Sequence, residues 1–448
     1  MVRDLEPGLS PGPAARPGGR SRSSAARLAG PARTALRWLR APLPPPPDSL
    51  RRGPLRPDAF PSALRSPRLT SLLGIALAVA FTVCFGTGLI SHLIQHPPAW
   101  FWWPSRPVGL YRVTQGLHVA TGLATVPLLG AKLWSVYPRL FGWPPARDLA
   151  HAAERASIAV LVAAALFQLV SGVLNIARWY EPMPFFFTAG HYWSAWLAVG
   201  ALIAHIGVKL PTVRQALARQ PDGPALDGPA LDRSALDRSA LDRPAAGELT
   251  RRGLLGTVGV AAGVITLATA GQTVAPLAPV SVLAPRRPQT GPQRLPVNRT
   301  AAGAGVRDAA FDPRYRLTVA GPVRTVHLGL PELAALPQHT VVLPISCVEG
   351  WSATGTWTGV RLRDLLGLVG VDPADAEAYV ESLEVRGRYR ATTVPPPHSR
   401  DPFTLIALRL GGEILHPDHG YPARLIAPNR PGVLQTKWVA RITARRPE

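Results

Sequence analysis

Four apolar stretches between residues 69 and 210 decide most of what this chain can fold into. They run over about Leu69–Ile94, Leu110–Val136, Ser157–Ile176 and His191–Leu210. Each is long enough to cross a bilayer core of about 30 Å. Because backbone groups in lipid must bond within their own segment, these stretches predict four membrane helices.

The basic residues of the chain predict how these helices are oriented. The formal net charge is +22, from 49 Lys and Arg against 27 Asp and Glu, which alone would fit a nucleic-acid partner. However, the positive charge concentrates in the first 68 residues and beside the apolar stretches, as it does at the inner side of a membrane. We therefore expect no nucleic-acid partner, a cytoplasmic N-terminus, and outward-facing loops at 95–109 and 177–190.

Histidines within the apolar stretches predict a redox bundle, because ionisable groups in membrane helices usually face the bundle interior. His118 lies on the second stretch, and His191 and His205 lie fourteen residues apart on the fourth. Fourteen residues are nearly four helical turns, about 21 Å, so both can face two stacked haems. His118 could share an outer haem with His191 or a more central haem with His205, and His92 is the other candidate partner.

This four-helix portion is similar to bacterial membrane cytochromes of the b type, which implies haem b. His151, in an inner loop, is a further candidate ligand for an inner haem. Two alternatives stay open: single histidines that only bond backbone carbonyls, and a bundle that binds no haem.

The segments around the bundle predict a tail, a linker and an anchor. Residues 1–66 are rich in Arg, Pro, Ser and Gly, which predicts a disordered basic tail, and the membrane domain follows at 67–212. Residues 213–248 contain a repeated Ala-Leu-Asp unit that cannot form a core, which predicts a linker. In 249–284, Arg251 and Arg252 precede a Gly- and Ala-rich apolar run, which resembles a twin-arginine export signal kept as a fifth membrane helix. Alternatively, the two arginines only follow the positive-inside tendency.

Residues 285–448 predict an α+β domain on the outer face of the membrane. An uncharged run from Val341 to Ile345 reads as a strand, and Val360 begins a helical pattern. Cys347 is therefore expected on a loop between a strand and a helix. The other cysteine, Cys84, lies within an apolar stretch, so no structural disulfide is expected. A buried cysteine is often a small hydrophobe, and the alternative is a thiolate ligand to a soft metal.

Two segments carry a resemblance that favours the metal ligand: "CVEGWS…WTGVRLRDLL" from Cys347, and "HGYPARLIAPNRPGVLQTKWV" at 419–439. Together they resemble the molybdopterin-binding domain of the sulfite oxidase family over roughly residues 290–448. The resemblance implies the sulfite oxidase catalytic fold, and it implies that the sulfur of Cys347 binds molybdenum. It also implies that the cofactor is held by a further set of residues: Asn298, Arg299, His419, Arg424, Gln435, Thr436 and Lys437.

The residues after Cys347 depart from the sulfite-oxidising members. Those members have a basic cluster there, whereas this chain has Val348, Glu349, Gly350 and Trp351. An acidic rim disfavours an anionic substrate. "CVEGWS" is closer to the catalytic subunits of the exported methionine sulfoxide reductase, in which an Asn stands at the position of His419.

These observations predict a multi-domain, multi-pass membrane oxidoreductase that depends on molybdopterin. We expect oxygen-atom transfer that reduces a small or protein-bound S- or N-oxide, with electrons from the quinol pool through haem b. Oxidation of a small substrate with electrons passed to quinone is an alternative. A cofactor-free, membrane-anchored binding module is another.

Overall fold

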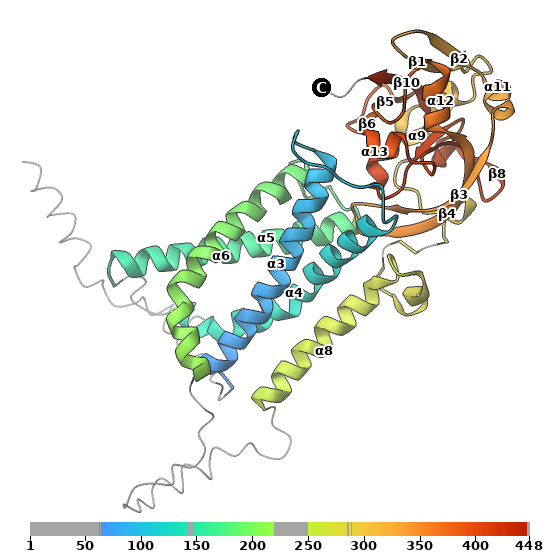
Figure 1. Cartoon of the computed structure of the whole chain (residues 1–448). Helices are drawn as coiled ribbons and strands as arrows, with labels where there is room; N and C mark the ends of the chain where they lie inside the picture. The colour runs from blue at the N-terminus through green and yellow to red at the C-terminus, as the bar shows by residue number, and fades with distance from the viewer. Residues whose placement is uncertain are drawn as a thin grey trace, which may run out of the picture.

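Five long helices make up the N-terminal part of the structure, a computed structural model that describes residues 62, 64–140, 147–218, 250–284, 286–287 and 289–445. They are α3 (Pro67–Gln95), α4 (Leu110–Leu140), α5 (Leu149–Ala177), α6 (Phe187–Ala218) and α8 (Arg251–Ala270) (Figure 1). All five are long and apolar enough to cross a membrane. The predicted helical bundle with a fifth helix is confirmed. The predicted tail and linker lie outside the described residues except at their edges.

Side-chain caps fix where three of these helices begin. Ser66 accepts a hydrogen bond from the backbone of Leu69, and Pro67 occupies the first turn of α3, where a missing N–H costs nothing. Asp148 caps α5 and Thr250 caps α8 in the same way. The C-terminal cap of α5 is Arg178, in the left-handed conformation with φ 56°.

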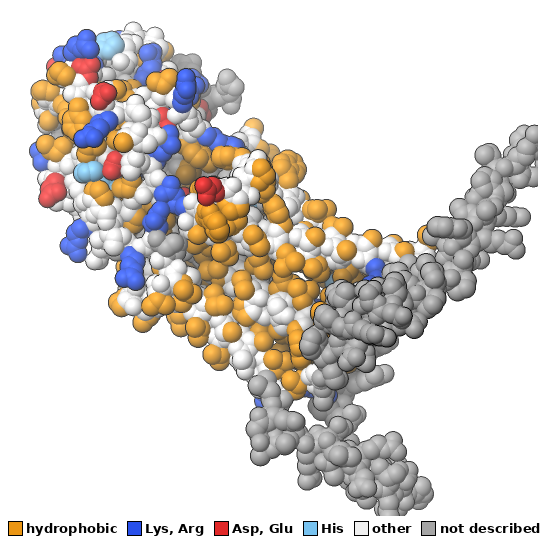
Figure 2. Space-filling view, turned by 180° about the vertical axis from the view of Figure 1, so that it is seen from behind, with side chains coloured by type: hydrophobic (Ala, Val, Ile, Leu, Met, Phe, Trp, Pro, Cys, Tyr) orange, Lys and Arg blue, Asp and Glu red, His pale blue; other side chains and the backbone are white. Residues whose placement is uncertain are grey.

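The bundle presents apolar side chains outward. α3 packs against α4 and α6, α5 packs against α6, and α8 lies along α4 (Figure 1). Hydrophobic side chains cover the outside of these helices, whereas charged groups are spread over the C-terminal domain (Figure 2). Val79, Ile203 and Val260 are 60%, 66% and 66% exposed. Such a surface associates with a membrane, because lipid is its natural solvent.

Two five-stranded sheets form the C-terminal domain, as the predicted α+β class requires. The first has the order β2-β1-β10-β5-β6: Thr325–Leu328, Leu317–Ala320, Val439–Arg445, Glu377–Ser382 and Ala391–Val394. The second runs β3-β4-β7-β8, with β9 paired to β7: His339–Ser346, Ser352–Arg361, Leu405–Leu410, Glu413–Ile414 and Arg424–Ile426. Among the strand pairs in the described part of the chain, only β1–β10 is parallel.

Short helices complete the connections of this domain. The α-helices are α9 (Ala301–Ala304), α10 (Arg307–Ala310), α11 (Leu330–Ala335), α12 (Leu362–Leu368) and α13 (Pro396–Ser399). Four 3₁₀ turns lie at η1 (Ala275–Val280), η2 (Pro292–Arg294), η3 (Pro417–His419) and η4 (Gly432–Leu434).

The expected loop after Cys347 is wrong for residues 352–361, which form strand β4. Residues 352–359 of β4 pair with β3, in register from Ser346 opposite Ser352 to His339 opposite Gly359. Burial on the sheet explains the strand, because Trp357 and Val360 enter the core while the threonines face outward. Helix α12 begins only at Leu362. Cys347 therefore lies in a hairpin between two strands.

Candidate active site

A five-residue turn, Cys347–Trp351, presents the cysteine at the end of the β3–β4 hairpin. The backbone N–H of Cys347 donates to the carbonyl of Trp351 at 2.8 Å, and that of Gly350 donates to the carbonyl of Cys347 at 3.0 Å. Gly350 has φ 97°, a backbone conformation that residues other than glycine rarely adopt. The hairpin therefore fixes the direction in which the sulfur points.

The sulfur of Cys347 lies among polar atoms although the residue is only 4% exposed. Nδ2 of Asn298 lies 3.0 Å from Sγ, and a carboxylate oxygen of Glu349 contacts both Sγ and that amide. Oδ1 of Asn298 in turn accepts a hydrogen bond from the indole N–H of Trp351 at 3.2 Å. Burial, followed by Glu349, raises the pKa of the Cys347 thiol well above its ordinary value. A bound metal would have to displace that proton.

Arg178, from the end of α5, reaches into this group of residues. Its Nη2 donates to the backbone carbonyl of Asn298 at 2.7 Å, and its Nε lies 3.8 Å from Oε1 of Glu349. The bundle thus supplies a cation that is already engaged by Glu349 and by the backbone of Asn298.

The second motif folds against the cysteine hairpin. Pro431 forms a bridge with Ser346, and a Cβ on Gly432 would lie only 3.9 Å from Cα of Cys347. The two motifs, separated by about seventy residues in the sequence, therefore form one site.

Three of the second-motif residues that were predicted to hold the cofactor keep buried polar atoms without hydrogen-bond partners among the described residues. They are Nε of Arg424, Oε1 of Gln435 and Oγ1 of Thr436. Other atoms of the same side chain do bond: Nη1 of Arg424 donates to the carbonyl of His419 at 3.0 Å. Because buried polar groups are normally satisfied, this cluster fits a polar ligand such as a pterin or phosphate.

Lys437 supplies a positive charge whose protonation depends on its surroundings. Its Nζ donates to the carbonyls of Arg299 and Asp418, both at 2.7 Å. Burial, and then Arg424, lower the pKa of Lys437 to about 7. An anion beside this ammonium would replace the lost hydration.

Two residues expected at the cofactor make other contacts. Nε2 of His419 bonds the carbonyl of Pro292 at 2.7 Å, so this ring braces the backbone from which Arg424 is held. The side chain of Arg299 pairs with Glu384 at 2.7 Å. Neither contact brings these side chains next to Sγ of Cys347.

Sequence reasoning missed two buried basic residues near the second motif. Nη2 of Arg430 donates to Thr392 and to the carbonyl of Thr393, and its Nε has no partner among the described residues. His398 is 1% exposed, and burial together with Arg430 lowers its pKa to about 3. Arg430 stands in the quoted motif and was detectable there, whereas no sequence signal marks His398.

Comparison with known proteins now identifies this part of the chain. Residues 304–448 match the family described as the oxidoreductase molybdopterin binding domain. They form a molybdopterin-binding oxidoreductase domain. The match begins after Asn298, so the molybdopterin domain draws part of its site from the segment before it.

Curated relatives agree with this assignment. The putative protein-methionine-sulfoxide reductase subunit YedZ1 of Azospira oryzae is 36% identical over 126 residues, 28% of this chain and 47% of that protein. The mitochondrial sulfite oxidase of Mus musculus is 29% identical over 166 residues, 31% of this chain and 30% of that protein. The NADH nitrate reductase of Ulva prolifera is 30% identical over 158 residues, 29% of this chain and 18% of that protein. The chain thus spans less than half the length of each.

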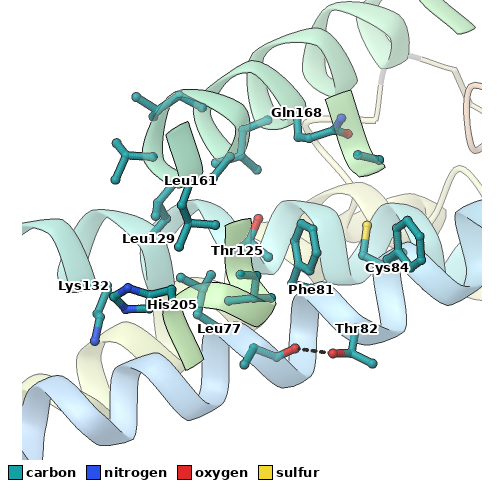
Figure 3. A pocket seen from close by; sticks show the side chains of 18 of the residues that line it. Leu77, Phe81, Thr82, Cys84, Thr125, Leu129, Lys132, Leu161, Gln168 and His205 are labelled. Carbon is teal, nitrogen blue, oxygen red and sulfur yellow. Dashed lines mark hydrogen bonds between the residues drawn. The ribbon is translucent and has the colours of Figure 1, made fainter. Parts of the chain in front are cut away.

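A cavity of about 1700 Å³ lies between the helices of the bundle. It is lined by six histidines: His92, His96, His118, His151, His191 and His205. Val348, next to Cys347 in the molybdopterin domain, also lines it. The cavity therefore extends from within the bundle to the cysteine hairpin. Figure 3 shows His205 and Lys132 towards one end and Cys84 towards the other.

His118 and His191 face one another across this cavity with ring centroids 6.3 Å apart. Nδ1 of His118 bonds the carbonyl of Cys84 at 2.8 Å, and Nδ1 of His191 bonds Oγ of Ser171 at 2.9 Å. Among the residues that the structure describes, neither Nε2 has a hydrogen-bond partner, so both remain for a ligand while Nδ1 is held as in metal sites. If haem were bound here, these two imidazoles could hold its iron.

The other candidate histidines are arranged differently. Nδ1 of His205 is buried without a partner among the described residues. His92 stacks on Tyr192, with centroids 3.7 Å apart, and on His96 at 4.7 Å. The structure thus brings His118 and His191 together, and it does not bring His92 into that pair.

Proposed function

We propose that this chain is a membrane-bound oxidoreductase in which Cys347 holds molybdenum and the bundle holds haem b. The single observation that carries the proposal is the cavity of about 1700 Å³, which joins His118 and His191 to the residue next to Cys347. Histidines that line a cavity reaching the Cys347 turn would place haem close to the molybdenum ligand. Electron transfer between haem and molybdenum needs this proximity.

The contacts of Cys347 support its role as the molybdenum ligand. Its sulfur is held by Asn298 and by the hairpin rather than packed only among aliphatic groups. Arg424, Gln435, Thr436 and Lys437 would hold the pterin and its phosphate, since a guanidinium and an ammonium suit a fixed anion. Bound molybdenum supplies two-electron oxygen-atom transfer.

The free Nε2 atoms of His118 and His191 support haem near the molybdopterin domain. Gly88 leaves space for the His118 ring, because a Cβ at this position would lie only 2.7 Å from Cε1 of His118. His205 would serve a second haem deeper in the bundle, with His151, which also lines the cavity, as its candidate partner. Haem iron supplies one-electron steps.

The contacts between the two parts support the proposed topology. The loops expected outside, 95–109 and 177–190, are those that contact the C-terminal domain: Arg106 pairs with Asp401 at 3.1 Å, and Arg178 bonds Asn298. The N-terminus and the C-terminal ends of α4 and α6 would then face the cytoplasm, with the molybdopterin domain outside. Arg251 and Arg252, at the start of α8, would direct its export.

We favour reduction of an S- or N-oxide by quinol. Glu349 beside Cys347 disfavours an anionic substrate such as sulfite, and the similarity to a putative protein-methionine-sulfoxide reductase subunit agrees with an S-oxide. The similarity to sulfite oxidase favours the reverse direction as a second candidate, with electrons passed to quinone.

Metal analysis and an anaerobic substrate screen test these proposals. Purified full-length protein should contain molybdenum and show a b-type band in its reduced-minus-oxidised spectrum. An S-oxide or N-oxide should then reoxidise dithionite-reduced protein. Protein without molybdenum would rule out both enzyme proposals, whereas protein with molybdenum but no b-type band would rule out only the haem route.

A further inference from the structure

The turn that carries Cys347 is seated on helix α4 of the bundle. Nε2 of Gln115, a buried side chain of α4, donates a hydrogen bond to the carbonyl of Val348 at 2.8 Å. Gln115 lies one helical turn before His118, and Val348 follows Cys347 directly. One side chain therefore connects the helix of a candidate haem ligand to the turn of the candidate molybdenum ligand.

The segment after α8, at residues 272–273, also bonds the Cys347 turn. Oγ1 of Thr273 donates to the carbonyl of Gly350 at 2.5 Å, and the N–H of Ser352 donates to the carbonyl of Gln272 at 2.6 Å. Arg112 of α4 donates to the carbonyl of Thr273 at 2.5 and 3.0 Å. Three segments that are distant in the sequence are thus fixed together by hydrogen bonds.

Packing leaves no room between the turn and α4. A Cβ on Gly350 would lie 2.6 Å from Cγ2 of Val119, closer than side-chain atoms approach one another. Val119 and Val348 both line the histidine-lined cavity. The turn therefore forms part of the wall at one end of that cavity.

We propose that Gln115 is a positioning residue that fixes the Cys347 turn against α4 and so sets the route of electrons between the bundle and the molybdopterin domain. This proposal rests on the function proposed above. The electron count closes: oxidation of a quinol releases two electrons and two protons, and reduction of an S-oxide to a thioether and water consumes both. Each turnover needs two one-electron passages along the route.

Among the described residues, Gln115 is the side chain of α4 that bonds the turn 347–351 directly. Gln115→Met keeps a similar volume and removes the donor. Thr273→Val removes the second bond to the turn and keeps the shape of the side chain. Thr114→Val is the matched control, because within the described part of the chain the hydroxyl of Thr114 bonds only the carbonyl of Tyr111 in its own helix.

The test uses full-length protein in lipid nanodiscs whose molybdenum and haem contents are measured first. In Gln115→Met, amide hydrogen exchange at residues 348–352 should quicken about tenfold. Reoxidation of reduced haem by methionine sulfoxide should slow about tenfold, and it should slow more than turnover with reduced methyl viologen, a soluble donor that bypasses the haem. Thr273→Val should change both quantities in the same direction, and Thr114→Val should change neither.

Unchanged exchange or unchanged haem reoxidation in fully loaded Gln115→Met would overturn the proposal, and Thr273→Val decides it if Gln115→Met does not fold. Failure of the underlying function is distinguishable, because wild-type protein would then lack one of the metals or fail to reoxidise with the oxide.

Discussion

Nε of Arg178, at the end of helix α5, lies 3.8 Å from Oε1 of Glu349, two residues after Cys347 in the molybdopterin domain. Arg178 also donates to the backbone carbonyl of Asn298, whose amide lies 3.0 Å from the cysteine sulfur. A residue of the membrane bundle therefore takes part in the surroundings of the candidate molybdenum ligand. The site cannot be described from the molybdopterin domain alone.

Replacing Arg178 should loosen the site. Arg178→Met removes a charged hydrogen bond from a partly buried position and leaves Glu349 without this cation, a loss of about 1–3 kcal/mol. We expect the thermal transition of the C-terminal domain, followed by tryptophan fluorescence, to fall by several degrees. Arg294→Met is the control, since Arg294 is exposed and its side chain bonds, among the described residues, only the side chain of Gln289. Equal shifts in the two variants would contradict the prediction.

Removing the sulfur of Cys347 should remove molybdenum and leave haem. Cys347→Ser keeps the size of the side chain but loses the soft ligand. Oxide-dependent turnover should then be abolished, molybdenum content by metal analysis should fall, and the b-type band should persist. Cys84→Ser should keep its molybdenum, because Cys84 lies in α3 beside His118. Retained turnover in Cys347→Ser would refute the ligand assignment.

Loss of His191 should remove the haem nearest the molybdopterin domain. His191→Ala leaves His118 with no imidazole opposite it. The reduced-minus-oxidised spectrum should lose a substantial part of its b-type band. His327→Ala changes a histidine of strand β2 that bonds Thr318 and should leave the spectrum as in wild type. A full band in His191→Ala would exclude this residue as an iron ligand.

Binding of the molybdopterin phosphate should weaken as pH rises above about 7. Burial and Arg424 lower the pKa of Lys437 to about 7, so its ammonium is lost above that pH. Cofactor binding at pH 8 should therefore take up a proton. Cofactor retention, measured by molybdenum content after dialysis at pH 6 and pH 9, should differ in wild type. It should be low and pH-independent in Lys437→Met, and Lys437→Arg should retain the cofactor at both values.

The lowered pKa of Lys437 also predicts that the cofactor-free domain becomes more stable as pH rises, whereas cofactor binding weakens. The pKa of Lys437 is lowered from 10.5 to about 7 on folding, so the unfolded chain binds the proton more tightly between these values. Stability should therefore rise with pH across this window. Chemical unfolding of cofactor-free wild type at pH 6.5 and pH 9 checks the sign, with Lys437→Met as the variant that should lose the difference.

Periodicity and length were sufficient to predict the bundle, because a membrane helix depends on a run of apolar residues within one segment. Short strands such as β1 and β7 were predicted as well, since their β-branched and apolar residues mark them locally. Strand β4 was missed because its glycines read as a loop. Its partners in β3 and β7 come from elsewhere in the chain and stabilise it despite those glycines.

Only the site residues that the resemblance names could be predicted from the sequence. Their roles at a cofactor stay predictions: the structure places the amide of Asn298 3.0 Å from the sulfur of Cys347, Arg424 bonds Gln435, and Lys437 bonds the carbonyl of Arg299. The contributions of Arg178 and Gln115 were not predictable. Both come from membrane helices, and only the packing of the bundle against the molybdopterin domain brings them to the cysteine turn.

The tight approach of Gly350 to Val119 has a consequence for the history of the chain. A larger side chain at either position would push the two halves apart, so a change in one half is tolerated only when the other half changes with it. The membrane and catalytic parts therefore cannot be exchanged freely with those of related proteins. We expect substitutions at Gly350 and at Val119 to be tolerated only in combination.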